Sequence, residues 1–411
     1  MKNIKWINSI LALTVFGLIT SCQPGAKTLK EGLWRGAFAL PGNEIPFAFE
    51  VKGKSADSTS VFLINGTDRF ELKNVTYNND SVTIPIDLYS SVLKGKLSEN
   101  TLEGVLVKVN TDKPVAGVPF KAEFGEIPRF PKSNEAPSVS LAGTWDINII
   151  SPKDTNKTVG NFDQKESLVT GSILTTTGDF RFLEGVVQGK KIAISAFGGS
   201  SPYLLKGEFT NDSTFAGEFI TPRSTSKVEG KRNPKAALPD PYTASHLKEG
   251  FSTIEFSFPN LEGKKVSLTD SIYKGKVVIV TILGSWCPNC LDENAFLSEW
   301  YKSNNKRGVE IIGLGFERKD DFESAKKSLS NLKTRLGIPY EILFVGKSST
   351  EAASKALPAL NGISAFPTTI FIDKKGNVRK VHTGFNGPAT GKFYEEFKTE
   401  FNGLIDSLVA E

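Results

Sequence analysis

Cysteine, histidine and long apolar runs are scarce in this chain of 411 residues, which contains three cysteines and two histidines. So few cysteines cannot form the dense disulfide framework that holds small secreted domains together. No apolar run reaches the roughly 20 residues that a membrane-spanning helix needs, so a bundle of such helices is excluded. A net charge of +5 is too small for electrostatic binding of nucleic acid. The length and the hydrophobic content of 39% instead predict two or three packed cores.

The first 22 residues, MKNIKWINSILALTVFGLITSC, have a basic start, a short apolar stretch and an exit of small residues. This order predicts a secretory signal over residues 1–21. The exit Ile-Thr-Ser-Cys resembles a bacterial lipobox, which implies that Cys22 carries lipid after cleavage. An ordinary signal peptide with an incidental cysteine is the alternative. Acyl chains contribute roughly 0.8 kcal/mol per inserted methylene, so we expect a periplasm-facing lipoprotein of the cell envelope, anchored without a spanning helix.

From about residue 29 to residue 235 the chain shows short alternating apolar runs, broken by Gly, Asn, Asp and Ser, as in many short antiparallel strands. This half repeats itself: GLWRGAFAL is matched by GTWDINII, and GKLSENTLEGVLV by GEFTNDSTFAGEFI, with Trp34 and Trp145 111 positions apart. A period this long indicates a duplicated domain. We count about eight candidate strands per copy, so each copy is predicted to be a meander curled into a small barrel or an open half-barrel. Both tryptophans are expected to be core residues.

Proline-rich stretches follow each copy, and beyond the second the pattern changes to alternating strands and helices. KVVIVTIL and GVEIIGLGF are predicted buried strands, and PNCLDENAFLSEWYKS and DDFESAKKSLSNLKTRLG are predicted helices, the second ended by Gly337. This order predicts a mixed sheet covered by helices on both faces. The predicted organisation is a signal at 1–21, a tether at 22–30, β-rich repeats at 31–127 and 141–233, linkers at 128–140 and 234–249, and an α/β domain at 250–411.

Cys287 and Cys290 stand three positions apart in TILGSWCPNCLDENAF, directly after a buried strand. Pro288 suits the first position of a helix, which places Cys287 at the helix N-terminus, where unpaired amides and the helix dipole stabilise a thiolate. A thiolate attacks disulfides, and a second cysteine one turn on can resolve the mixed disulfide. We therefore predict that Cys287 attacks and Cys290 resolves, with no cofactor beyond this redox-active pair.

Three other interpretations of the pair are less favoured. A structural zinc site needs four ligands, and beyond the pair the chain has only Cys22, His246 and His382 as further cysteine or histidine ligands. A peroxiredoxin frame needs proline and threonine where this chain has Val280 and Gly284. A purely structural disulfide closes too short a ring to restrict the unfolded chain much.

Residues 251–411 resemble the TlpA/ResA group of thioredoxin-fold, membrane-tethered periplasmic thiol–disulfide oxidoreductases. The resemblance rests on FSFPNLEGKKVSLTD, GKVVIVTILGSWCPNC and GISAFPTTIFIDKKGNV, in the order and spacing of that group. It implies an α/β thioredoxin-like domain, which together with the duplicated strand pattern predicts a multidomain chain of two tandem all-β domains followed by that domain. It also implies an enzyme that reduces disulfides of client proteins, as in cytochrome c maturation or envelope redox homeostasis, with electrons from a membrane thiol-transfer protein. An oxidase or isomerase is chemically possible with the same residues.

The resemblance assigns further site residues. Pro367 is expected to be a cis-proline facing Cys287, a conformation that is cheap only at X-Pro bonds, and the backbone of Phe366 is expected to pair with an extended client segment. Trp286 is expected to pack beside the disulfide, and Trp286, Pro288 and Phe366 are the predicted client-binding residues.

Glu293 lies one helical turn beyond Cys290, so its carboxylate can face the pair. The group carries an acidic residue here that assists proton movement, and a carboxylate beside a buried thiol raises its pKa and can relay a proton. A solvated glutamate is the alternative. Thr281 stands where thioredoxins have a buried aspartate, and Asp292 is expected in solvent on another helix face. His382 is expected to be a surface or hairpin histidine, with a catalytic base as the alternative.

A second hypothesis belongs to another class of function. In that interpretation the duplicated β-domains bind a ligand or an envelope partner and dominate the function of the lipoprotein, with the redox domain as an auxiliary. No group of residues within 30–235 has the pattern of an active site.

Overall fold

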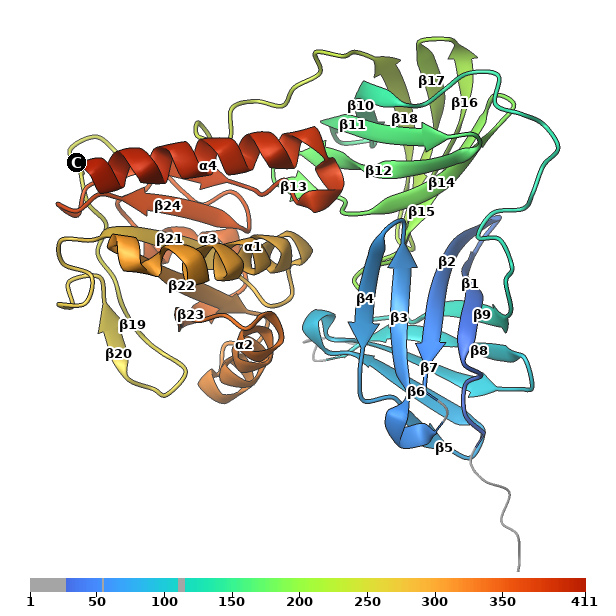
Figure 1. The fold of residues 1–411 in the computed structure, drawn as a ribbon, viewed down its shortest axis with the longest axis horizontal. Coiled ribbons are helices and arrows are strands. Elements are labelled where there is room, and N and C mark those ends of the chain that lie inside the picture. The colour runs from blue at the N-terminus through green and yellow to red at the C-terminus, as the bar shows by residue number, and fades with distance from the viewer. Residues whose placement is uncertain (1–26, 54, 110–114) are drawn as a thin grey trace, which may run out of the picture.

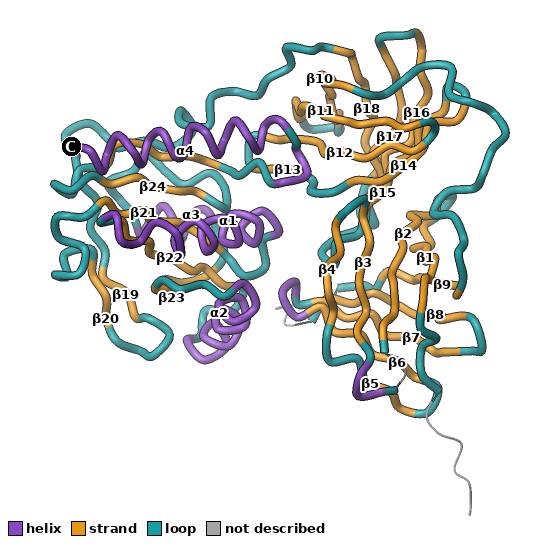
Figure 2. The backbone as a smooth tube through the Cα atoms, in the orientation of Figure 1, coloured by secondary structure: helices purple, strands orange, loops and turns teal. Residues whose placement is uncertain are grey.

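The structure is a computed structural model that describes residues 27–53, 55–109 and 115–411. The predicted signal at 1–21 and the predicted lipid attachment residue Cys22 lie outside the described residues. Two β-sheets of the N-terminal half stand beside an α/β domain (Figure 1). All four α-helices of the described part lie in that α/β domain (Figure 2). None of the described helices combines the length and apolarity needed to cross a bilayer.

The first sheet is an open antiparallel meander of nine strands in the order β4-β3-β2-β1-β9-β8-β7-β6-β5. Its strands are β1 (Gly32–Leu40), β2 (Asn43–Lys52), β3 (Ser60–Asn65), β4 (Asp68–Leu72), β5 (Thr76–Asn78), β6 (Ser81–Ile86), β7 (Ser91–Leu97), β8 (Thr101–Lys108) and β9 (Val118–Phe124). Because the first strand pairs with the last, β4 and β5 become the two edges, and the sheet is a half-barrel.

The second sheet repeats this pattern and closes. Its strands are β10 (Gly143–Ile150), β11 (Thr155–Lys165), β12 (Leu168–Thr175), β13 (Gly178–Asp179), β14 (Leu183–Gln188), β15 (Lys191–Ala196), β16 (Tyr203–Asn211), β17 (Thr214–Ile220) and β18 (Thr225–Arg232). β11 pairs with β12 and β12 pairs with β14, which completes a barrel of eight strands with β13 as a short addition. The predicted pair of tandem all-β domains is confirmed.

The repeat is visible in the way each tryptophan is held. Trp34 and Trp145 are 1% and 0% exposed, so both are core residues as predicted. Trp34 donates its indole N–H to the carbonyl of Lys30 at 3.0 Å, and Trp145 donates to Leu141 at 2.7 Å, each four residues back along the chain. A buried indole needs such a partner, and the same local bond provides it in both copies.

The two β-domains share a polar interface centred on Arg129, which is 6% exposed. Its guanidinium donates to the carbonyls of Ile64 and Ser195 and forms an ion pair with Glu184 at 3.4 Å. Asn65 adds a two-point contact with the backbone of Phe197. These bonds join the half-barrel to the barrel, so both form one support for the α/β domain.

The α/β domain contains a mixed sheet in the order β23-β22-β21-β24-β25. Its elements are β19 (Ser257–Pro259), β20 (Lys265–Ser267), β21 (Val277–Leu283), α1 (Pro288–Asn304), β22 (Val309–Glu317), α2 (Phe322–Leu336), β23 (Glu341–Lys347), α3 (Thr350–Ala356), β24 (Thr368–Ile372), β25 (Val378–Thr383) and α4 (Lys392–Ala410). The cluster with α1, α2 and α4 covers one face of the sheet and the cluster with α3 the other, as predicted for a thioredoxin-like domain. Gly337, in the left-handed conformation, ends α2 as expected.

Candidate active site

The cysteine pair lies where β21 ends and α1 begins. Cys287 is the N-cap residue of α1, and its sulfur accepts a hydrogen bond from the backbone N–H of Cys290 at 3.3 Å. Both cysteines are free thiols, with exposed fractions of 5% for Cys287 and 0% for Cys290. Burial, and then the contact with Cys287, raise the pKa of the Cys290 thiol well above its usual range. The two thiols are therefore unequal, and Cys287 is the one that a disulfide can reach first.

Glu293 is buried directly beneath the pair, so it is not the solvated glutamate that was the alternative. Glu293 is 2% exposed, and its carboxylate accepts hydrogen bonds from the hydroxyls of Thr281 at 2.6 Å and Thr369 at 2.7 Å. Burial raises the pKa of Glu293 to about 7, although both hydroxyls act against this shift. The carboxylate also contributes to the raised pKa of Cys290. A carboxyl that titrates near neutral pH beside a buried thiol can accept and return its proton.

Thr281 explains how this carboxyl is held. It stands on the central strand β21, fully buried, at the place where thioredoxins carry an aspartate, and it donates to Glu293. The buried acid is thus supplied by helix α1, with the strand providing only a hydroxyl.

A second buried carboxyl, missed by the sequence analysis, holds the loop before the cysteines. Glu317, at the end of β22, is 4% exposed and accepts from both the backbone N–H and the hydroxyl of Ser285 at 2.8 Å. Burial raises its pKa to about 7 as well. Its position after a buried strand on the C-terminal edge of the sheet is the signal that sequence analysis could have used.

The loop before β24 completes the site. The peptide bond between Phe366 and Pro367 is cis, as expected, and the Cys287 thiol donates to the carbonyl of Phe366 at 3.4 Å. The Trp286 ring packs edge-on against the Phe366 ring, with centroids 5.4 Å apart, and its indole N–H donates to the backbone carbonyl of Phe316 at 2.9 Å. The structure thus brings the predicted client-binding residues around Cys287.

Two expectations about charged side chains were wrong. Asp292 is not in solvent, because it forms a two-point ion pair with Arg181 of the barrel, at 2.8 and 3.0 Å, with 14% of its side chain exposed. His382 lies in the hairpin of β24 and β25 but not at the surface, because it is 6% exposed between Tyr242 and Phe397. Burial lowers the pKa of His382 to about 4, so this histidine is neutral at ordinary pH. Both errors arise because other elements cover these positions: Arg181 of the barrel covers Asp292, and Tyr242 and Phe397 cover His382.

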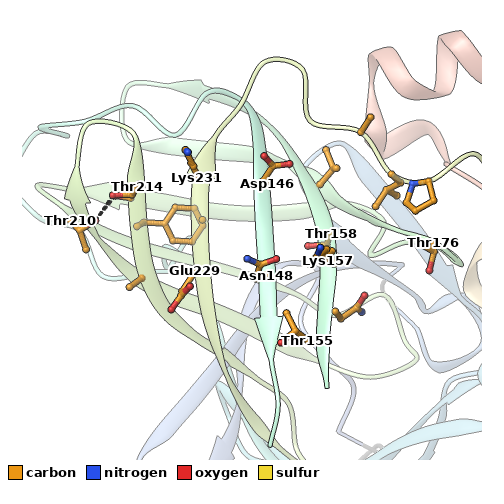
Figure 3. A pocket seen from close by; sticks show the side chains of 18 residues that line it. Asp146, Asn148, Thr155, Lys157, Thr158, Thr176, Thr210, Thr214, Glu229 and Lys231 are labelled. Atoms are coloured by element: carbon orange, nitrogen blue, oxygen red, sulfur yellow. Dashed lines mark hydrogen bonds between the residues drawn. The ribbon is translucent and has the colours of Figure 1, made fainter. Parts of the chain in front are cut away.

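A cavity of about 1060 Å³ lies on the barrel, away from the cysteines (Figure 3). Asp146 and Asn148 line it from β10, on the opposite strand face from the core residue Trp145. Lys157 and Lys231 add two cationic side chains. The described residues contain no cluster of three or more histidine, cysteine or acidic side chains able to hold a metal ion.

The α/β domain is similar in sequence and fold to known proteins. Residues 250–381 match the AhpC/TSA family. The thiol-disulfide oxidoreductase ResA of Geobacillus thermodenitrificans is 31% identical over 135 residues, which are 33% of this chain and 69% of the relative. The thiol:disulfide interchange protein DsbE of Vibrio cholerae is 32% identical over 146 residues, 35% of this chain and 70% of the relative. A thiol:disulfide interchange protein of Chlorobium tepidum, known from its crystal structure, has 23% identity and a TM-score of 0.30, covering 39% of this chain and 98% of the other.

Proposed function

Because the chain belongs to the family of ResA thiol-disulfide oxidoreductases, we propose that it reduces disulfide bonds of client proteins in the cell envelope, where lipid on Cys22 anchors it. The observation that carries the proposal is the pair of free thiols at the start of α1, one reachable and one buried beside a carboxyl of raised pKa. Clients are envelope proteins with disulfides, including those of cytochrome c maturation or general envelope redox homeostasis. A membrane thiol-transfer protein returns the pair to its reduced form.

The proposed reaction has two balanced steps. The Cys287 thiolate attacks one sulfur of the client disulfide, forming a mixed disulfide and releasing one client thiolate. Cys290 gives its proton to Glu293 and attacks the Cys287 sulfur, which releases the second client thiolate and leaves a Cys287–Cys290 disulfide. Two electrons have then passed to the client. Its two thiolates take up two protons, one returned by Glu293 and one from the solvent that received the Cys287 proton, and no other cofactor takes part.

The reduction potential of the Cys287–Cys290 couple tests the direction of this reaction. We expect a value of roughly −270 to −230 mV, in the range of thioredoxin and glutaredoxins, from equilibration in thiol buffers and counting of alkylated cysteines. The reduced chain should then reduce one disulfide of an unfolded, disulfide-bonded peptide per cysteine pair. A potential near −120 mV would identify an oxidant or isomerase and would contradict the reductase proposal.

The lipid anchor has its own test. A Cys22→Ala variant, expressed in a bacterium with lipoprotein processing, is expected to leave the detergent phase in a Triton X-114 partition while the parent remains in it, because several acyl chains bind bilayers strongly. Both proteins should keep the same exchange rate with glutathione disulfide. If the variant partitions as the parent does, Cys22 is not the anchor.

The barrel cavity favours a second candidate function, in which the β-domains bind a ligand or partner and the redox domain serves that complex. The cavity of about 1060 Å³ has the size of small-molecule sites and is lined by polar side chains of β10, β11, β17 and β18. Deletion of residues 31–233 distinguishes the candidates. If the remaining domain restores the redox phenotype of a strain that lacks the protein, binding by the β-domains is not the main function.

A further inference from the structure

A segment of the barrel, residues 176–181, packs against the start of α1, and neither the exchange chemistry nor the barrel core requires this contact. The segment connects β12 to β14 and contains β13 (Figure 1). Asn289, between the two cysteines, pairs its side-chain amide with the backbone of Asp179. With the amide oriented to satisfy both groups, its nitrogen donates to the Asp179 carbonyl at 3.0 Å and its oxygen accepts from the Asp179 N–H at 3.2 Å. The barrel thus binds the dipeptide that separates the cysteines.

Two glycines permit this close approach. A Cβ atom on Gly178, which has a φ of +138°, would lie 1.9 Å from the nearest atom of the Asn289 side-chain amide. A Cβ on Gly384, with a φ of +82°, would lie 2.8 Å from the carbonyl carbon of Thr177. Gly384 in turn donates its N–H to the carbonyl of Pro367 at 2.9 Å. The segment therefore spans from the Cys-Pro-Asn-Cys motif to the loop beside the cis-proline, along one side of Cys287.

Charged side chains hold the segment in place. Arg181 donates from two nitrogens to the Asp292 carboxylate, and the two side chains are only 15% and 14% exposed. The same guanidinium donates to the hydroxyl of Tyr89, from the half-barrel, at 3.3 Å. The Asp179 carboxylate accepts from the backbone N–H of Gly387 at 2.7 Å. A two-point, partly desolvated arginine–carboxylate pair is both stronger and more directional than a surface ion pair.

The contact decides from which side a client can approach. Between Tyr89, Arg181 and Pro288 there is a cavity of only about 20 Å³, room for little more than one water molecule. A cleft of about 260 Å³ lies on the side of Ser285 and Glu317, and its other wall is the half-barrel. Cys287 keeps 5% of its surface exposed. Ser285, which lines this cleft, lies two residues before Cys287, and a cleft with walls from two domains is narrower than a folded protein surface.

We propose that Asp179 and Arg181 are specificity-determining residues of the exchange reaction. They hold residues 176–181 as a wall beside Cys287, so that a narrow, extended disulfide-bearing segment reaches the sulfur and a folded protein surface does not. The inference rests on the proposed function and specifies the shape of its substrate.

The test compares second-order rates of reduction of two substrates by the reduced full-length chain: glutathione disulfide as the narrow one and native insulin as the folded one. Arg181→Met and Asp292→Asn each remove one partner of the ion pair that holds the wall. The matched control is Arg307→Met, which removes the pair with Asp406 in the same domain as α1, far from the cysteines in the fold. Loss of the pair shifts the population toward the open arrangement, so the insulin-to-glutathione rate ratio should rise about tenfold or more in both variants. The Arg307→Met ratio should equal that of the wild type.

Each alternative outcome has a distinct meaning. An unchanged ratio in Asp292→Asn, the milder variant, together with wild-type circular dichroism, overturns the proposal. Equal changes in both rates also overturn it, because Arg181 would then act on the thiols and not on access. If the wild type reduces neither substrate, the proposed function fails, and this result is distinguishable because it does not depend on any barrel variant.

Discussion

Replacing Cys287 by serine is expected to lower the rate of disulfide exchange by about a thousandfold or more, because a neutral hydroxyl is a weak nucleophile and cannot form the mixed disulfide. Cys290→Ser should behave differently. Its Cys287 still attacks, but no thiol resolves the product, so a covalent adduct with the client accumulates. Intact-protein mass spectrometry after mixing with glutathione disulfide should find this adduct in Cys290→Ser and not in Cys287→Ser.

The chain supplies its own control for this pair. Cys22→Ser replaces the one cysteine outside the pair and leaves Cys287 and Cys290 intact, so this variant should carry out disulfide exchange at the wild-type rate. The geometry sets the order of attack, since Cys287 is 5% exposed and Cys290 is covered completely. An adduct on Cys290 in the Cys287→Ser variant would reverse the proposed roles.

Local signals in the sequence predicted the elements and the order of the domains. The alternation of short strands predicted the β-domains, the equivalent positions of Trp34 and Trp145 predicted the repeat, and proline after Cys287 predicted the start of α1. Closure was not predictable. The second copy closes through pairing of β11 with β12 and of β12 with β14, whereas the first leaves β4 and β5 as edges. Such pairings between strands depend on twist and length of the whole sheet, which no single strand pattern encodes.

The site residues likewise divide into those that the sequence predicted and those that only the folded structure brings together. Cys287, Cys290 and Glu293 were predicted from one short motif and its helical spacing, and Pro367 from the resemblance to a family. Arg181 was missed because its partner Asp292 is 111 positions away, and only the docking of the barrel brings them together. His382 was misplaced for a related reason, since α4 covers it with Phe397. Periodicity shows that a face is apolar or polar, but not which distant surface covers it.

Glu293→Gln is expected to slow the resolving step about a hundredfold at pH 7, because general acid–base catalysis by a positioned group contributes roughly that factor or more. The glutamine keeps the shape and can still accept from Thr281, but it cannot take the proton of Cys290. The measurement is the rate at which the mixed disulfide disappears, followed by quenching and alkylation from pH 5 to pH 9.

The pH profile gives the sign of the effect. Glu293 accepts a proton only when ionised, so the wild-type rate should rise with pH through about 7, the raised pKa of this carboxyl. In the variant this rise should disappear, and the rate should rise only at higher pH, as the Cys290 thiol itself ionises. Glu317→Gln is the matched control, because it removes another buried carboxyl with a pKa of about 7 that bonds Ser285 and not the region of Cys290. Parallel profiles for Glu293→Gln and the wild type would exclude Glu293 from proton transfer.

The pH dependence of the free energy of unfolding distinguishes a catalytic role of Glu293 from the effect of its burial alone. The folded pKa of Glu293, about 7, lies above the ordinary value of 4.5, so folding favours the protonated acid. As pH rises from 4.5 through 7, the unfolded chain ionises first, and the wild type loses stability. Glutamine has no such loss. The free energy of unfolding of Glu293→Gln, relative to the wild type, should therefore increase by about 2 to 3 kcal/mol between pH 5 and pH 8. If this gain in stability appears while the resolving rate is unchanged, Glu293 is a buried acid without a catalytic role. If the resolving rate falls as well, the raised pKa of Glu293 accounts for both the stability change and the slower resolving step.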